Sequence, residues 1–140
     1  MATRSRIAIE NQDGTVKSVY CHWDGYPSNN GKILQENYQD LDKVEKLIKL
    51  GQISYIAEEV EAPEGAPHSF ESPMGGVTVA YHRDRGEDYI QPKEHQSLSG
   101  FVKSDVEEYG YVFTKEGEWL FVNGHKSPGA REAEPLVNVL

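Results

Sequence analysis

The segment with the densest chemistry is residues 20–27, where thiol, imidazole, indole and carboxylate side chains follow one another directly. Strand alternation through this segment would place His22 and Asp24 on one face and Cys21 and Trp23 on the other. An imidazole beside a carboxylate suits acid–base chemistry or metal ligation. The alternation therefore predicts a presenting half, His22 and Asp24, and a packing half, Cys21 and Trp23. The simpler alternative is a turn preceded by a half-exposed strand histidine.

A second candidate segment, residues 81–88, follows a predicted strand. If strand spacing continues through it, Arg83 and Arg85 point to the same side and can bind one phosphate or carboxylate together. Tyr81 would lie in register with them and could stack on a base or ring. The alternative is a salt-bridged loop in which Asp84 and neighbouring acids neutralise both arginines.

Both segments contribute to one predicted binding site if the fold brings them together. Arg4 and Arg6 share a face at the entry to the first strand and would join the site if the strands are neighbours. The predicted ligand-binding residues are His22, Trp23, Asp24, Tyr26, Tyr81, His82, Arg83 and Arg85.

No catalytic residues, metal ligands or cofactor are assigned from the sequence. Cys21 and His22 are adjacent in a strand and face opposite sides, which excludes a nucleophile–base pair, so a buried and inert thiol is expected. The five histidines have no tight spacing, and a single cysteine excludes a thiolate zinc cluster.

The composition limits the class of protein. A chain of 140 residues has the length of a single domain. Its formal net charge of −9 argues against nucleic-acid binding, because phosphates would repel it. One cysteine allows no intramolecular disulfide, and no apolar run approaches the ~20 residues that span a bilayer. Without a signal-peptide pattern, the expected location is the cytoplasm, with no membrane contact.

Two hairpins and two helices should position the candidate residues. Residues 6–10 and 16–22 alternate around Asp13-Gly14, which predicts an N-terminal hairpin. Residues 109–114 and 118–122 predict a second hairpin near the C-terminus, and residues 77–81 predict a further strand.

Helices are predicted before Tyr38 and from Asp40, which can cap the second one, to Gly51 as its C′ residue. The expected fold is α+β: about five mostly antiparallel strands with the two helices on one face. Residues 61–76 are expected to form a long exposed loop, residues 82–99 to be irregular, and residues 123–140 to be a flexible tail unless Leu136 and its apolar neighbours dock.

Several stretches resemble a family of small uncharacterised proteins encoded by tailed bacteriophages and prophages. The resemblance covers roughly residues 3–90, and the C-terminal third is less distinctive. It rests on TRSRIAIE (3–10), DGTV (13–16), YCHWDGYP (20–27), Lys43-Val44, Leu50-Gly51 and YHRDRGE (81–87). The family carries no established activity and no catalytic residues. The resemblance implies a phage accessory protein that works in the bacterial host cytoplasm during infection, where such proteins bind and block host factors or sequester nucleotide-derived defence signals.

Three functional hypotheses follow from the residues and the resemblance. The first is a non-enzymatic binding protein that counters a host defence factor by sequestering a nucleotide-like small molecule. The second is an inhibitor that binds a host protein through an exposed patch anchored by Trp23 or Tyr26. The third is a small hydrolase or nucleotide-processing enzyme that pairs His22 or His82 with Asp24 or Asp84. A homodimer formed through exposed strand edges is a further expectation.

Overall fold

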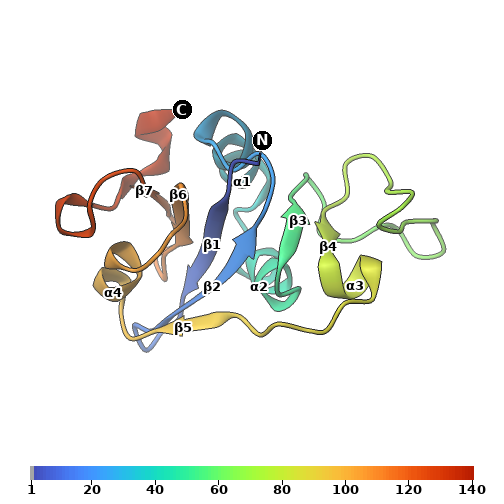
Figure 1. Ribbon diagram of the computed structural model, residues 1–140, viewed down its shortest axis with the longest axis horizontal. Helices are drawn as coiled ribbons and strands as arrows, with labels where there is room; N and C mark the ends of the chain where they lie inside the picture. The colour runs from blue at the N-terminus through green and yellow to red at the C-terminus, as the bar shows by residue number, and fades with distance from the viewer. Residues whose placement is uncertain (1) are drawn as a thin grey trace.

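The computed structural model describes residues 2–140, which form one mixed β-sheet flanked by short helices (Figure 1). The α+β class is confirmed, although the described residues contain eight strands rather than about five. The strand order is β4-β3-β2-β1-β6-β7-β8, and β5 pairs with β2 outside this path. The strands are β1 Ser5–Glu10, β2 Val16–Cys21, β3 Ile53–Tyr55, β4 Val79–Ala80, β5 Lys93–His95, β6 Tyr109–Phe113, β7 Trp119–Asn123 and β8 Glu134–Pro135. The helices are η1 Pro27–Gly31, α1 Lys32–Asn37, α2 Leu41–Lys49, α3 Tyr81–Arg85, α4 Leu98–Lys103, η2 Pro128–Ala130 and η3 Leu136–Val139.

Both predicted hairpins form, and β1 joins them into one sheet. In the first hairpin β1 and β2 pair antiparallel around a turn in which Gly14 has φ +89°. In the second, β6 and β7 pair antiparallel from Tyr109 opposite Asn123 onwards. The two hairpins meet because β1 runs parallel to β6, with Ser5 opposite Tyr109. The first strand of the chain therefore lies in the middle of the sheet.

Each face of the sheet has its own apolar core. On one face α1 and α2 bury Leu34, Val44 and Leu47 against the side chains of alternate sheet residues. On the other face α4 buries Phe101 and Val102. The prediction of two helices on one face holds for α1 and α2, but it missed α4, which lies on the opposite side (Figure 1).

Helix α2 follows its sequence signals closely. Val44, Leu47 and Ile48 are buried, as their spacing predicts, and Gly51 follows the helix with φ +77°. Asp40 occupies the N-cap position, but its side chain makes no capping hydrogen bond.

The strand predicted over residues 77–81 is wrong at its end. Strand β4 ends at Ala80, and Tyr81 is the first residue of α3. The Asp84 carboxylate accepts a hydrogen bond from the Ala80 amide (2.8 Å), which closes the first turn, and Gly86 ends the helix with φ +79°. Successive helical residues are rotated by about 100°, so Arg83 and Arg85 point in different directions rather than to one side.

Residues 82–99, expected to be irregular, contain most of α3, all of β5 and the first residues of α4. Residues 61–76 form no helix or strand, and their ends meet at a bridge between Glu59 and Val77. At the C-terminus β8 pairs with β7, and η3 places Leu136 fully inside the first core.

Strand β5 brings His95 into the second core. Its Nε2 lies 2.8 Å from Ser18 Oγ, and its ring packs edge-on against Phe101 at 5.2 Å between centroids. Burial lowers the pKa of His95, and the positive charges of Lys93 and Arg6 lower it further. His95 is therefore expected to be neutral in the folded protein at pH 7.

This gives a pH-dependent stability. Between the folded pKa of His95 and the unfolded value of about 6.5, the unfolded chain binds more protons than the folded one, so the free energy of unfolding rises with pH. The contribution of His95 to stability is therefore complete above about pH 6.5 and is lost as the pH falls below it. Urea denaturation between pH 7.5 and 5 should show this slope, and His95→Gln should reduce it. An equal slope in His95→Gln and the wild type would contradict the prediction.

Candidate functional site

The segment 20–27 leaves the sheet as a fixed loop. Strand β2 ends at Cys21, but the His22 and Trp23 amides still bond to the Ile53 and Ser54 carbonyls (3.0 and 2.9 Å). Asp24 then adopts φ +56°, a left-handed conformation that is uncommon outside glycine. The chain turns there, and η1 begins at Pro27.

The predicted division of this segment is only half correct. Cys21 packs in the core as expected, and burial raises the pKa of its thiol to about 11, which makes it inert at neutral pH. Trp23 does not pack in the core: its residue surface is 41% exposed, because the strand has already left the core when the chain turns at Asp24. Tyr26 is 39% exposed beyond the turn. We call residues 22–31 the aromatic loop.

A buried polar network holds the aromatic loop from below. Asn30, which is fully buried, donates from Nδ2 to Ser5 Oγ (3.2 Å) and to Cys21 Sγ (3.5 Å). The Gly25 amide donates to the Thr3 carbonyl (2.8 Å), and the Tyr111 hydroxyl donates to the Gly25 carbonyl (2.6 Å). The loop backbone is therefore anchored to β1, β2 and β6.

This supporting set is not evident from the sequence. Ser28-Asn29-Asn30-Gly31 indicated only a break in the strand, although Asn29 also bonds back to the Asp24 carbonyl (3.1 Å). The available signal was the pair of consecutive asparagines in the break that follows a buried strand, because such side chains bond readily to nearby backbone.

His22 pairs with Tyr20 rather than with Asp24. Its Nδ1 lies 2.6 Å from the Tyr20 hydroxyl, and its ring meets Trp23 edge-on at 4.7 Å between centroids. Among residues 2–140 no hydrogen bond or ion pair joins His22 to Asp24, so the predicted imidazole–carboxylate pair does not form. Burial raises the pKa of Tyr20, and the positive charge of Arg4 opposes that rise.

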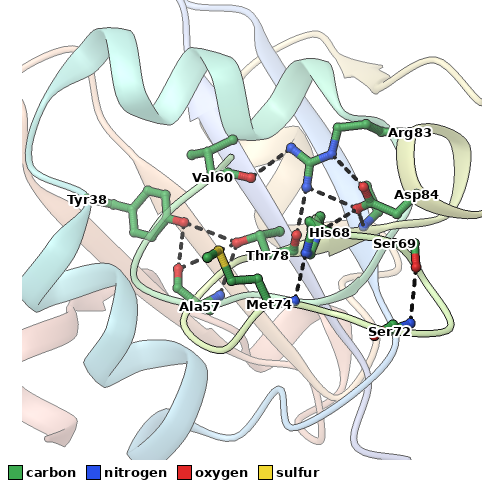
Figure 2. A network of polar contacts seen from close by, with 11 residues as sticks. Tyr38, Ala57, Val60, His68, Ser69, Ser72, Met74, Thr78, Arg83 and Asp84 are labelled. Carbon is green, nitrogen blue, oxygen red and sulfur yellow. Dashed lines mark hydrogen bonds and ion pairs between the residues drawn. The ribbon is translucent and has the colours of Figure 1, made fainter. Parts of the chain in front are cut away.

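Arg83 and Asp84 form a clip that fastens residues 61–76 to α3 (Figure 2). Arg83 donates to both oxygens of Asp84 (3.0 Å each) and to the carbonyls of Val60 (2.7 Å) and Thr78 (2.6 Å). The Asp84 carboxylate, whose side chain is 4% exposed, also faces His68 Nε2 at 3.4 Å. The Asp84 carbonyl accepts from the Phe70 amide (3.0 Å). These contacts use Arg83 internally.

The other residues of this segment also bond within the chain. Arg85 lies 3.4 Å from Glu87 and over the ring of Phe70. His82 bonds through Nδ1 to the Glu87 carbonyl (2.7 Å) and stacks edge-on against Tyr89. The arrangement is the salt-bridged alternative, and the predicted convergence of Arg83 and Arg85 on one anion is wrong because α3 is helical.

The two predicted segments are separated by β3. Cys21 pairs with Ile53, and Ile53 pairs with Ala80, so one strand lies between them. Tyr81 is the first residue of α3, whereas Trp23 and Tyr26 lie in the aromatic loop. Five hollows of about 200–820 Å³ on the described part of the chain have none of the eight predicted residues in their linings.

No group of three or more histidine, cysteine, aspartate or glutamate side chains within residues 2–140 is arranged to hold a metal ion. No helix there has both the length and the apolar surface needed to cross a bilayer.

Comparison of the chain with family models, with curated proteins and with solved structures gives no match.

Proposed function

We propose that the chain is a non-enzymatic binding protein that docks onto a protein partner through the aromatic loop, with Trp23 and Tyr26 as anchors. The observation that carries this proposal is that two large exposed aromatic side chains stand on a loop fixed by buried hydrogen bonds. Tryptophan and tyrosine are the residues most enriched among binding hot spots.

The supporting network gives the loop the rigidity that binding favours. A flexible loop loses conformational entropy when it binds, whereas a loop already held in one conformation does not. Burying the polar groups of Asn30 and Ser5 is unfavourable unless they are hydrogen-bonded, and here their bonds fix the loop backbone. These hydrogen bonds thus stabilise one conformation of the loop backbone that carries Trp23 and Tyr26.

The C-terminal residue Leu140 lies beside the last residue of the aromatic loop. A Cβ on Gly31, the last residue of the aromatic loop, would lie 3.4 Å from Leu140 Cδ2, and Leu140 and Val137 are both more than half exposed. Figure 1 shows the C-terminus near α1 at the same end of the molecule as the start of β1. With Asp24 between the anchors and a chain charge of −9, the partner surface expected is an apolar pocket rimmed by lysine or arginine.

The resemblance to phage proteins suggests that this partner is a host protein in the bacterial cytoplasm and that docking counters a host defence factor. The nucleotide-sequestering hypothesis at the predicted site loses its main support, because Arg83 and Arg85 are bonded within the chain. The enzyme hypothesis loses support in the same way, because neither His22–Asp24 nor His82–Asp84 forms a pair among the described residues.

Capture from a lysate of infected bacteria tests the proposal. The tagged chain should retain a defined protein, and Trp23→Ala should weaken binding of the purified partner by about 30- to 1,000-fold, the effect of losing a hot-spot aromatic. Tyr26→Ala should weaken it less. Because both side chains are exposed, thermal melting should remain close to that of the wild type.

Leu41→Ala is the matched control. Leu41 is 43% exposed on α2, so its loss removes a similar exposed apolar surface away from the aromatic loop. Equal binding by the wild type and Trp23→Ala, or equal losses in Trp23→Ala and Leu41→Ala, would refute docking through the loop. If the free chain forms a dimer and Trp23→Ala abolishes that dimer, the partner of the aromatic loop is a second copy of this chain instead.

A further inference from the structure

A small hollow opens on the sheet face opposite α1 and α2. It has a volume of about 220 Å³ and lies between β2 and the segment that leads into β5. The polar side chains that line it are Arg6, Ser18, Tyr20, Gln52, Gln91 and Lys93. None of its lining residues is acidic, although the chain carries 23 aspartates and glutamates against 14 lysines and arginines. The lining is therefore rich in hydrogen-bond donors and carries positive charge, although the net charge of the chain is negative.

Arg6 is fixed in the hollow with donors to spare. It donates from Nε to Ser18 Oγ (3.0 Å) and from Nη2 to the Ser18 carbonyl (3.3 Å). A guanidinium has five N–H donors, so most of them have no hydrogen-bond partner among the described residues. The orientation of the fork is set by Ser18, which is itself fully buried.

The charge of Arg6 is not neutralised by direct contact. Among residues 2–140 neither Arg6 nor Lys93 forms an ion pair within 4.0 Å, and the acids that act on Arg6, Glu107 and Asp105, do so only at longer range. Burial lowers the pKa of Arg6. A half-buried cation without a counter-ion is unfavourable, and a bound anion would offset that cost.

We propose that this hollow, the oxyanion hollow, binds a phosphate group through Arg6 and Lys93. A planar fork beside a flexible ammonium suits a tetrahedral anion, because the fork gives two parallel bonds and the ammonium gives a point charge. The volume is below the ~300 Å³ at which sites for drug-sized ligands begin, so it accommodates the phosphate and not a whole nucleotide. The proposal is independent of docking through the aromatic loop.

The proposal is tested by titrating the full chain with inorganic phosphate at constant ionic strength and monitoring the amide chemical shifts. The amides of Ser18, Gln52 and Lys93 should shift and saturate. Lys93→Gln should weaken phosphate binding by about 10-fold, the effect of losing one charge-assisted bond, and Arg6→Lys should weaken it at least as much. Lys93 is exposed, so its replacement keeps the test valid if the Arg6 variant folds poorly.

Lys17→Gln is the control. It removes the same charge from β2, the strand that pairs with β5, but Lys17 neighbours Ser18 and points to the other side of the sheet. It should change phosphate affinity less than twofold. Absence of saturable shifts, or equal weakening by Lys17→Gln and Lys93→Gln, would overturn the proposal. A parallel titration with adenosine monophosphate distinguishes a phosphomonoester from free phosphate as the ligand. If adenosine monophosphate binds more tightly than phosphate and Lys93→Gln abolishes that binding, the ligand is a phosphomonoester. If the two affinities are equal, the ligand is free phosphate.

Discussion

Replacing Asp84 by Asn is expected to lower the free energy of unfolding by about 2–3 kcal/mol, with the loss centred on the clip between α3 and residues 61–76. The carboxylate is almost fully buried and bonds to Arg83 through both oxygens. Removing one partner of such a pair leaves the other charge uncompensated, which costs about 3–5 kcal/mol in a buried site. The Arg83 side chain is 28% exposed, so solvent reduces that figure.

The same substitution should change the acid dependence of stability. Burial raises the pKa of Asp84, but the hydrogen bonds from Arg83 and from the Ala80 amide outweigh it and hold the pKa below its usual value. The unfolded chain then binds a proton more readily than the folded one, so this stabilisation is complete above the unfolded pKa of about 3.9 and is lost as pH falls below it. Asp84→Asn should remove that component from denaturation curves measured between pH 6 and 3.

Glu87→Gln provides the comparison within the same segment. Glu87 pairs with Arg85 at 3.4 Å, but both side chains are about half exposed, so the loss should stay below about 1 kcal/mol. Amide hydrogen exchange should locate the effect of Asp84→Asn in residues 61–76 and α3. Similar stability losses in the two variants would show that the clip is not a buried interaction.

Replacing Gly25 by Ala is expected to lower the free energy of unfolding by about 2–3 kcal/mol and to abolish partner binding while both aromatic anchors remain. A Cβ at this position would lie 2.8 Å from Ser5 Cβ and 2.9 Å from the Thr3 carbonyl oxygen. The backbone cannot move away freely, because its amide bonds to Thr3 and its carbonyl to Tyr111. The added methyl group must therefore displace the aromatic loop.

Gly129→Ala is the matched control for this prediction. A Cβ on Gly129 would meet no atom within 4 Å, so the same chemical change should leave stability within about 0.5 kcal/mol of the wild type. Chemical denaturation and partner binding measured on both variants separate the two sites. A Gly25→Ala protein that binds its partner with wild-type affinity would contradict the requirement for a fixed loop.

The elements that could be predicted from the sequence are those set by local chemistry. The first hairpin follows from alternation around Asp13-Gly14, and α2 follows from the spacing of Val44, Leu47 and Ile48. Helix α3 has five residues and a polar sequence, so hydrophobic periodicity cannot reveal it. Strands β3 and β5 have three residues each and depend on their pairing with β2, which sequence spacing does not encode.

The candidate site shows the same division. Within the segment 20–27, burial of Cys21 follows from strand alternation. Exposure of Trp23 could not be predicted, because it depends on where the core ends and on the left-handed turn at Asp24. The internal use of Arg83 depends on carbonyls of Val60 and Thr78, which only the folded chain brings together.

The central place of β1 has a consequence for how the chain reaches its native state. Its partner on one side, β2, is available at once, but its partner on the other side, β6, begins only at Tyr109. During synthesis the first hairpin emerges early, and its β1 edge stays unpaired until Tyr109–Phe113 have been made. Such long-range pairing gives a high contact order and slow folding, so completion of this sheet must await the C-terminal hairpin.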